Sequence, residues 1–142
     1  MKQLLFVLAL VSSMLTSYAK DGITSPALAA GLKSSFPLAT EATWSASGDF
    51  FKAQFTQDGK EQTAFFTERG EWIATARNIS SEELPKELKA SLKEALQHSW
   101  ITDLIVITTE EGTSYFVQLQ SADNKIIKQS VGGKKWKSYT AL

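Results

Sequence analysis

The sequence contains no cysteine and only one histidine, His98. Without cysteine the chain has no disulfide framework, no thiolate ligand for a metal and no thiol nucleophile. A single imidazole cannot form a zinc site, which needs several converging ligands. His98 lies near the C-terminal end of a predicted helix, where the helix dipole favours a cation. We interpret it as structural, and we expect no metal site and no cofactor.

The sequence also lacks an excess of charge of either sign, with 15 basic and 15 acidic residues. This balance provides no global field to attract nucleic acid. The carboxylate pairs Glu82-Glu83 and Glu110-Glu111 join sequence neighbours, whose side chains diverge on a helix or strand and do not form an acid-base pair. No glycine-rich phosphate loop or nucleophile motif accompanies them. We therefore expect that the protein is not an enzyme.

The N-terminal residues have the layout of a secretory signal peptide. Lys2 supplies the positive start, Leu4–Val11 are apolar, and the small residues Ser17 and Ala19 suit a cleavage site. The apolar run is too short to span a bilayer, which takes about 20 residues. We predict a signal peptide over residues 1–19 and a periplasmic or secreted protein with no membrane insertion after cleavage.

The segment after the predicted signal peptide contains one short helix. Leu28, Leu32 and Phe36 recur every four residues, Pro26 suits a first helical turn, and Pro37 prevents continuation. At about ten residues this helix is marginal alone, so its apolar side must pack on other elements.

Alternating strands and tight turns follow. The turn residues are Gly48, Asp58-Gly59 and Gly70, and Asp-Gly is a strong signal for a two-residue hairpin loop. This loop places Phe51 opposite Phe66. A three-residue loop with Gly70 in the left-handed conformation then returns the chain to a fourth strand.

The order of helix and strands then repeats. Leu84, Leu88, Leu92 and Leu96 follow the helical spacing around Pro85, and further strands come after them. An offset of 64 residues superposes the helix stripes, turns and inward strand positions of the two halves. We predict a single domain over residues 20–142, built from two repeats at about 25–78 and 79–142. The fold class is α+β: each tandem unit has one helix followed by an antiparallel meander of about four strands, with the helices packed on one face of the sheet.

The strand face directed away from the helices, here called the far face, mixes aromatic and polar residues. This composition resembles that of protein interfaces, in which a few aromatics dominate the energy; cross-strand pairs without a binding role are the alternative. In the second unit we place the far face by assuming that residues 122–124 form a three-residue loop. The candidate binding residues on the far face are Phe50, Lys52, Phe65, Ile73, Phe116, Lys128, Lys137 and Tyr139.

The motif order resembles that of PepSY-like domains with similarity to beta-lactamase inhibitor proteins. The residues that carry this resemblance, over essentially the whole mature chain, are Pro26, Leu28, Leu32, Phe36, Pro37, Trp44, Phe51, Ala53, Phe55, Asp58, Gly59, Gly70, Trp72, Leu84 and Pro85. The resemblance implies two tandem helix-plus-sheet units, an envelope location and a binding role. In the inhibitors the concave sheet face grips the enzyme, and PepSY domains are associated with restraint of peptidases. This chain departs from the secreted inhibitors in having no disulfides.

The function expected from the sequence is that of an exported, non-enzymatic binding module. Its partner would be an envelope protein, bound through an exposed far face. By this binding the module would modulate or inhibit an envelope hydrolase or peptidase. The alternative is a small-molecule or lipid binder with a pocket between helices and sheet.

Overall fold

The structure is a computed structural model that describes residues 24–139. The predicted signal peptide lies outside the described residues. The described chain falls into two compact units, with residues 24–73 in unit 1 and residues 74–139 in unit 2.

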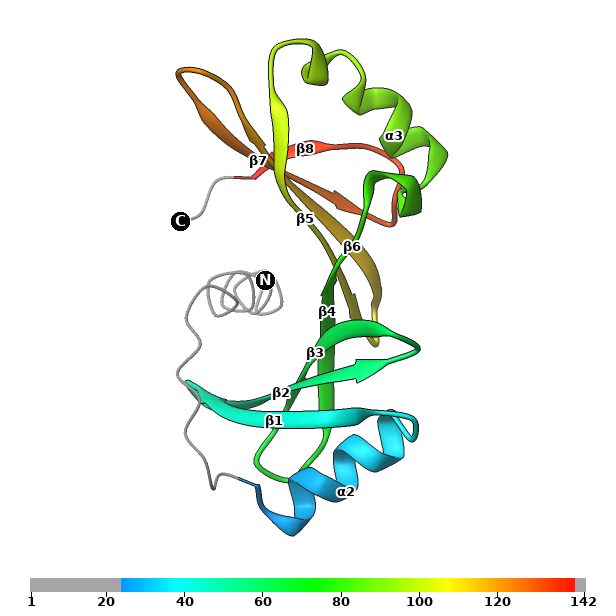
Figure 1. Cartoon of the computed structure of the whole chain (residues 1–142), viewed down its shortest axis with the longest axis vertical. Coiled ribbons are helices and arrows are strands. Elements are labelled where there is room, and N and C mark those ends of the chain that lie inside the picture. The colour runs from blue at the N-terminus through cyan, green and yellow to red at the C-terminus, as the bar shows by residue number, and fades with distance from the viewer. Residues whose placement is uncertain (1–23, 140–142) are drawn as a thin grey trace. The chain divides into compact units, whose positions relative to one another are not determined.

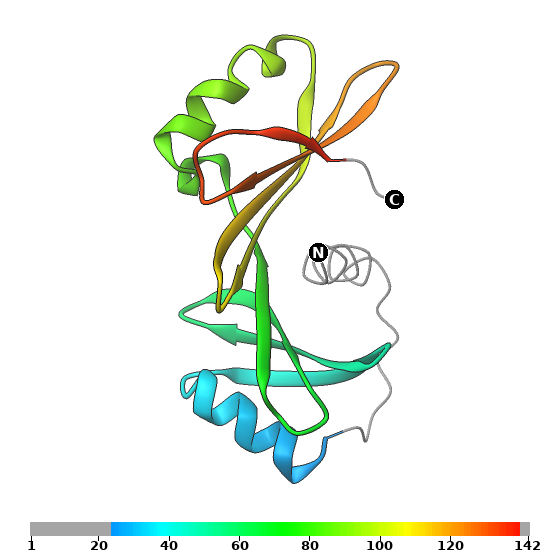
Figure 2. The same ribbon diagram turned by 180° about the vertical axis from the view of Figure 1, so that it is seen from behind.

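Each helix is followed by four strands, and the strands pair as antiparallel neighbours in chain order (Figures 1 and 2). The first set of elements is α2 (Pro26–Ser35), β1 (Thr40–Ser47), β2 (Phe50–Gln57), β3 (Lys60–Phe66) and β4 (Trp72–Asn78). The second set is the 3-10 turn η1 (Ser81–Glu83), α3 (Lys86–Leu92), the 3-10 turn η2 (Ala95–Gln97), β5 (Trp100–Thr109), β6 (Gly112–Gln120), β7 (Lys125–Val131) and β8 (Lys137–Tyr139). The α+β class and the helix-then-strands order predicted from the sequence are confirmed.

Helix α2 has the predicted boundaries because local chemistry defines both ends. The Leu28 N–H donates to the Ser25 Oγ at 3.2 Å, which caps the first turn. Pro26 occupies the first turn, where its missing N–H costs nothing. The Phe36 N–H donates to the Leu32 carbonyl at 2.7 Å, and the helix ends before Pro37.

The predicted turns of unit 1 are also confirmed. Asp58 and Gly59 have φ of 53° and 72°, as a type I′ turn requires, and Phe51 lies opposite Phe66. Gly70 has φ of 79° and closes the three-residue loop between β3 and β4. In this loop the Thr67 N–H donates to the Glu71 carbonyl at 2.9 Å.

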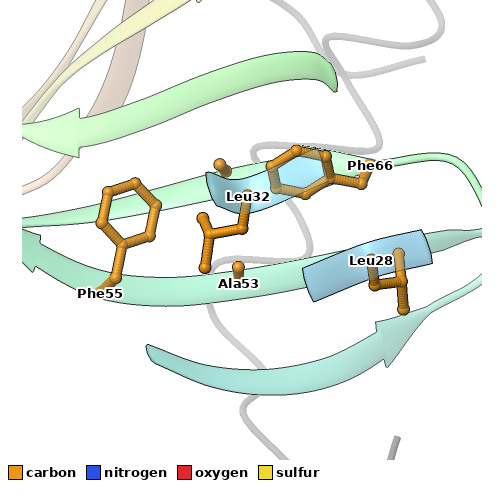
Figure 3. Close-up of a cluster of buried hydrophobic side chains, with 6 residues drawn as sticks. Leu28, Leu32, Ala53, Phe55 and Phe66 are labelled. Carbon is orange, nitrogen blue, oxygen red and sulfur yellow. The ribbon is translucent and has the colours of Figure 1, made fainter. Parts of the chain in front are cut away.

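The core of unit 1 lies between α2 and the strands. Figure 3 shows the side chains of Leu28 and Leu32 among Ala53, Phe55 and Phe66. Aromatic rings close the edges of this cluster. Phe36 lies 4.9 Å from Phe55, and Trp44 lies 5.6 Å from Phe66, between ring centroids.

Two glycines allow α2 to touch the loop between β3 and β4. A Cβ atom on Gly31 would lie 2.1 Å from the Gly70 carbonyl oxygen, and a Cβ on Gly70 would lie 2.1 Å from the Ala27 carbonyl oxygen. Both positions therefore require glycine, because backbone atoms on each side leave no space for a methyl group.

Replacing Gly31 with alanine should destabilise the protein, although alanine is the better helix former. At an open helical site the change stabilises by about 1 kcal/mol, whereas the clash with Gly70 should lower the free energy of unfolding by about 1–3 kcal/mol. Urea denaturation measures the difference. Ser34→Ala, at an exposed site on the same helix, is the control and should be neutral or slightly stabilising. Equal stabilisation by both changes would contradict the close approach.

The helix of unit 2 is shorter than its leucine spacing predicts. Helix α3 ends at Leu92, and Leu96 is 40% exposed beyond the separate turn η2. A strict four-residue spacing drifts by roughly 40° per step around a helix of 3.6 residues per turn. Leu88 and Leu92 therefore share a buried side, and Leu96 leaves it.

The core of unit 2 is built like that of unit 1. Leu88 and Leu92 of α3 pack against Val117 and Leu119 of β6. In addition, the Trp136 indole N–H donates to the Leu88 carbonyl at 3.0 Å, which joins the loop before β8 to the helix. This bond satisfies the polar atom of a half-buried tryptophan.

Candidate binding surface

In unit 1 the far face contains the four predicted residues, but two of them are buried. Lys52 pairs with Phe65 across β2 and β3. Phe65 is 0% exposed and Lys52 is 3% exposed, whereas Phe50 and Ile73 are half-buried. The expectation that this face is open to solvent is wrong for Phe65 and Lys52. Both lie in inner strands, β3 and β2.

Burial changes the acid-base behaviour of Lys52. Desolvation disfavours the charged ammonium and lowers the pKa of Lys52 from 10.5. Between the lowered pKa and 10.5 the unfolded chain binds more protons than the folded chain. The contribution of Lys52 to the free energy of unfolding therefore rises with pH in this window.

Replacing Lys52 with methionine should remove this rise. The free energy of unfolding of the native protein, measured relative to Lys52→Met by urea denaturation from pH 7 to pH 10, should increase with pH. The exposed Lys137→Met separates the effect of burial from the loss of one positive charge. A constant difference between the native protein and Lys52→Met across this range would show that burial does not perturb the lysine.

In unit 2 the structure corrects the predicted register by one residue. Gln120 pairs with Lys125, so the loop between β6 and β7 has four residues instead of three. The Ser121 N–H donates to the Asn124 carbonyl at 2.8 Å, and the Asn124 N–H donates to the Ser121 Oγ at 3.1 Å. Because a one-residue slip moves every side chain of a strand to the other face, Lys128 belongs to the helix side, opposite Val117.

The slip brings Ile127 and Gln129 to the far face of unit 2. They pair with Tyr139 and Lys137 of β8, which are on the predicted face. Tyr139 covers Phe116: the two rings meet edge to face with centroids 5.5 Å apart, and Phe116 is 3% exposed. The expectation of an exposed Phe116 ring is therefore wrong, since Tyr139 shields it.

The side chain of Tyr139 is itself largely removed from water. Its hydroxyl is buried and has no hydrogen-bond partner among the described residues. Burial disfavours the phenolate and raises the pKa of Tyr139 above 10.0. Tyr139 is thus a neutral hydrogen-bond donor at physiological pH.

A β-bulge shapes the start of the same face. The register of β5 and β6 shifts between Ile101 and Asp103, so Thr102 is an extra residue. The bulge places Asp103 on the same face as Trp100. The Gln118 amide donates to Thr102 Oγ1 at 2.7 Å and to Asp103 Oδ2 at 2.9 Å, which fixes the bulged segment.

Trp100 is a candidate binding residue that the sequence did not reveal. It continues the four-residue leucine spacing and therefore looks like part of the second helix. In the structure it begins β5 opposite Gln120 and is 56% exposed. One feature of the sequence separates Trp100 from the buried leucines. Residues spaced by four shift position around a helix, so residue 100 would lie roughly 120° away from Leu88.

The far face of unit 2 has a buried apolar centre and a more exposed surround. Phe116 and Ile107 are buried, whereas Trp100, Asp103 and Lys137 are exposed. Half-buried residues lie between them. The residues of this face used below, called the unit 2 surface, are Trp100, Asp103, Ile105, Ile107, Phe116, Gln118, Ile127, Gln129, Lys137 and Tyr139.

A hollow of about 360 Å³ lies at one border of unit 2. It is lined by Asn78–Ser81 and Ile101–Leu104, and α3 contributes no residue to the lining. This hollow is therefore not the pocket that was expected between helix and sheet. In that place the leucines of α3 pack against the strands.

Within residues 24–139, no group of three or more His, Asp or Glu side chains is placed to hold a metal ion. No helix in this part of the chain is both long enough and apolar enough to cross a membrane.

No protein-family model matches the chain. No curated protein matches it either. Solved structures do match its fold. A BLIP-like protein from Bacteroides fragilis has 22% sequence identity and a TM-score of 0.70, and the match covers 80% of this chain and 85% of that chain.

Two further solved structures agree with this match. A DUF2874 family protein from Bacteroides uniformis has 14% identity and a TM-score of 0.72, with 81% of this chain and 89% of that chain covered. A structure named "putative periplasmic proteins" from Bacteroides eggerthii has 16% identity and a TM-score of 0.71, covering 82% and 90%. The fold resemblance to beta-lactamase-inhibitor-like proteins is confirmed.

Proposed function

We propose that this chain is an exported, non-enzymatic binding module that holds another protein on the unit 2 surface. The observation that carries the proposal is Trp100, a large indole that is 56% exposed on the same strand face as Phe116 and Tyr139. Large aromatics with a polar surround dominate the energy of protein interfaces. Phe50 and Ile73, which are half-buried on the far face of unit 1, are a second and separate candidate contact.

The physical state of the surface fits a preformed binding site. Tyr139 and Phe116 hold one another in an edge-to-face contact. The bonds of Gln118 fix the bulge beside Trp100. Rings and loops that are ordered before binding lose less conformational entropy when a partner docks.

The fold match and the predicted export signal support the proposed class of partner. The BLIP-like relative supports an inhibitor-like module, and the periplasmic description of the B. eggerthii protein supports an envelope location. The proposed partner is therefore an envelope protein, with a hydrolase or peptidase as the first class to assay. An interface of standard size would bury about 800 Å² on each partner.

Trp100→Ala is the first test. Because the indole is exposed, the change should leave the free energy of unfolding within about 0.5 kcal/mol of the native value. It should weaken the complex by about 2 kcal/mol, roughly thirtyfold in Kd, if the tryptophan anchors the partner. Proteins captured from an envelope extract identify the partner, and titration of the purified partner by calorimetry measures the Kd.

Leu38→Ala is the matched control, because Leu38 is a 65% exposed apolar residue of unit 1 outside the proposed surface. The control should bind like the native protein. Equal binding by native protein, Trp100→Ala and Leu38→Ala would refute the unit 2 surface. If no protein binds while a lipid or small molecule does, the module is a ligand binder instead.

A further inference from the structure

Strand β1 is an edge of the sheet, and its second half, Thr43–Ser47, is unguarded. Among the described residues, β1 pairs only with β2, so its outer side carries no strand. It spans eight residues and contains neither lysine nor proline, the residues that usually protect an edge. The opposite edge strand, β8, has three residues and follows Lys134 and Lys135.

The turn after β1 determines which backbone groups point outward. Ser47 pairs with Phe50 across the two-residue loop Gly48-Asp49. Residues that flank such a loop bond to each other, and alternation along an antiparallel strand then directs the N–H and C=O groups of Ala46 and Trp44 outward. The irregularity between Thr40 and Thr43 limits the straight part of this edge to Thr43–Ser47.

We propose that the outer edge of β1 binds β1 of a second copy of this chain, antiparallel and centred on Ser45. In this register Trp44 of each copy bonds to Ala46 of the other. A two-fold axis relates the copies, as in most homodimers. The pairing extends each sheet through backbone hydrogen bonds, as in other cases of strand addition.

The side chains of β1 complement themselves in this register. On the helix side, each Trp44, which is half-buried, faces the exposed methyl group of Ala46, so a large residue lies beside a small one. On the far face, Ser45, which is 8% exposed in the single chain, faces its own copy, and Thr43 faces Ser47. Pairs of hydroxyl side chains are favourable across antiparallel strands. No charged side chain occurs from Ala42 to Ser47 to oppose the contact.

Charge does act just beyond the paired segment. Glu41 and Asp49 flank the paired segment, so each end of the antiparallel pairing has an acidic residue from both copies. These like charges weaken the dimer at low ionic strength. Because the Debye length falls from about 30 Å at 0.01 M salt to about 10 Å at 0.1 M, added salt should strengthen the association.

A single cysteine tests both the dimer and its register, since the chain has no native cysteine. Ser45 and its copy form a pair without backbone bonds, with Cα atoms about 4.5 Å apart, within the range for a disulfide. Ser45→Cys should therefore oxidise to a covalent dimer. Ala46→Cys is the control, because residues 46 of the two copies lie about 8 Å apart and cannot bridge.

The non-covalent dimer is measured by sedimentation velocity over a concentration series. The full chain is expressed with its predicted signal peptide and purified from the envelope fraction. Ala46→Pro removes an outward N–H and leaves the bonds to β2 intact. It should raise the dimer dissociation constant at least about tenfold. Thr43→Lys provides a second variant that weakens the edge if the proline variant does not fold.

The proposal predicts a salt-strengthened dimer, crosslinking of Ser45→Cys above the Ala46→Cys control, and weaker association of the edge variants. A chain that remains monomeric at all concentrations, with equal crosslinking at both positions, overturns it. A dimer unaffected by both edge variants places the contact elsewhere and also overturns it. Neither outcome depends on the partner of the unit 2 surface.

Discussion

The fold depends on the packing of each short helix against one face of its strands. The ten residues of α2 and the seven of α3 are too few for a stable isolated helix. Each helix is stabilised by the apolar area that it buries against the strands. The leucines that bury this area are Leu28 and Leu32 in α2 and Leu88 and Leu92 in α3. Helices and strands must therefore form together, without help from a disulfide.

This packing leads directly to the two-sided character of the strands. Successive side chains of a strand point to opposite faces, so a strand that fills the core with every second residue presents the remaining residues away from the helix. On β6 this alternation puts Val117 and Leu119 under α3 and gives Phe116 and Gln118 to the far face. Only the exposed positions of the far face, such as Trp100 and Lys137, are free to vary, because its buried residues also contribute to stability.

The sequence predicts the parts of this fold that local chemistry determines. The turns at Asp58-Gly59 and Gly70 need positive φ, and they set the register of unit 1 without reference to distant residues. The start of α2 is predictable for the same reason, because Ser25 and Pro26 define it. Alternation also predicts a second strand face that mixes aromatic and polar residues, although not its register in unit 2.

The errors arise where a tertiary interaction or a side-chain bond decides between similar local structures. The loop at Ser121 takes four residues because its hydroxyl bonds to Asn124, and this single residue changes the face of Lys128. Trp100 follows the leucine spacing of a helix, but its indole belongs to a strand whose bulge no short pattern reveals. Burial of Phe65 and Phe116 is likewise a property of the packed sheet, and no periodicity of two distinguishes a covered face from an open one.

The same contrast separates residues that support the unit 2 surface from residues that can act on a partner. Phe116 is 3% exposed beneath Tyr139, so truncating it removes buried area and is expected to cost stability before it affects binding. Trp100 and Lys137 contribute little buried area to the unit, so they can change without loss of the fold. Tyr139 connects the two groups, because its ring covers Phe116 and its buried hydroxyl has no acceptor among the described residues. Because this hydroxyl is closed to the outside, its unpaired donor is a cost to the folded unit that the contact of the ring with Phe116 helps to offset.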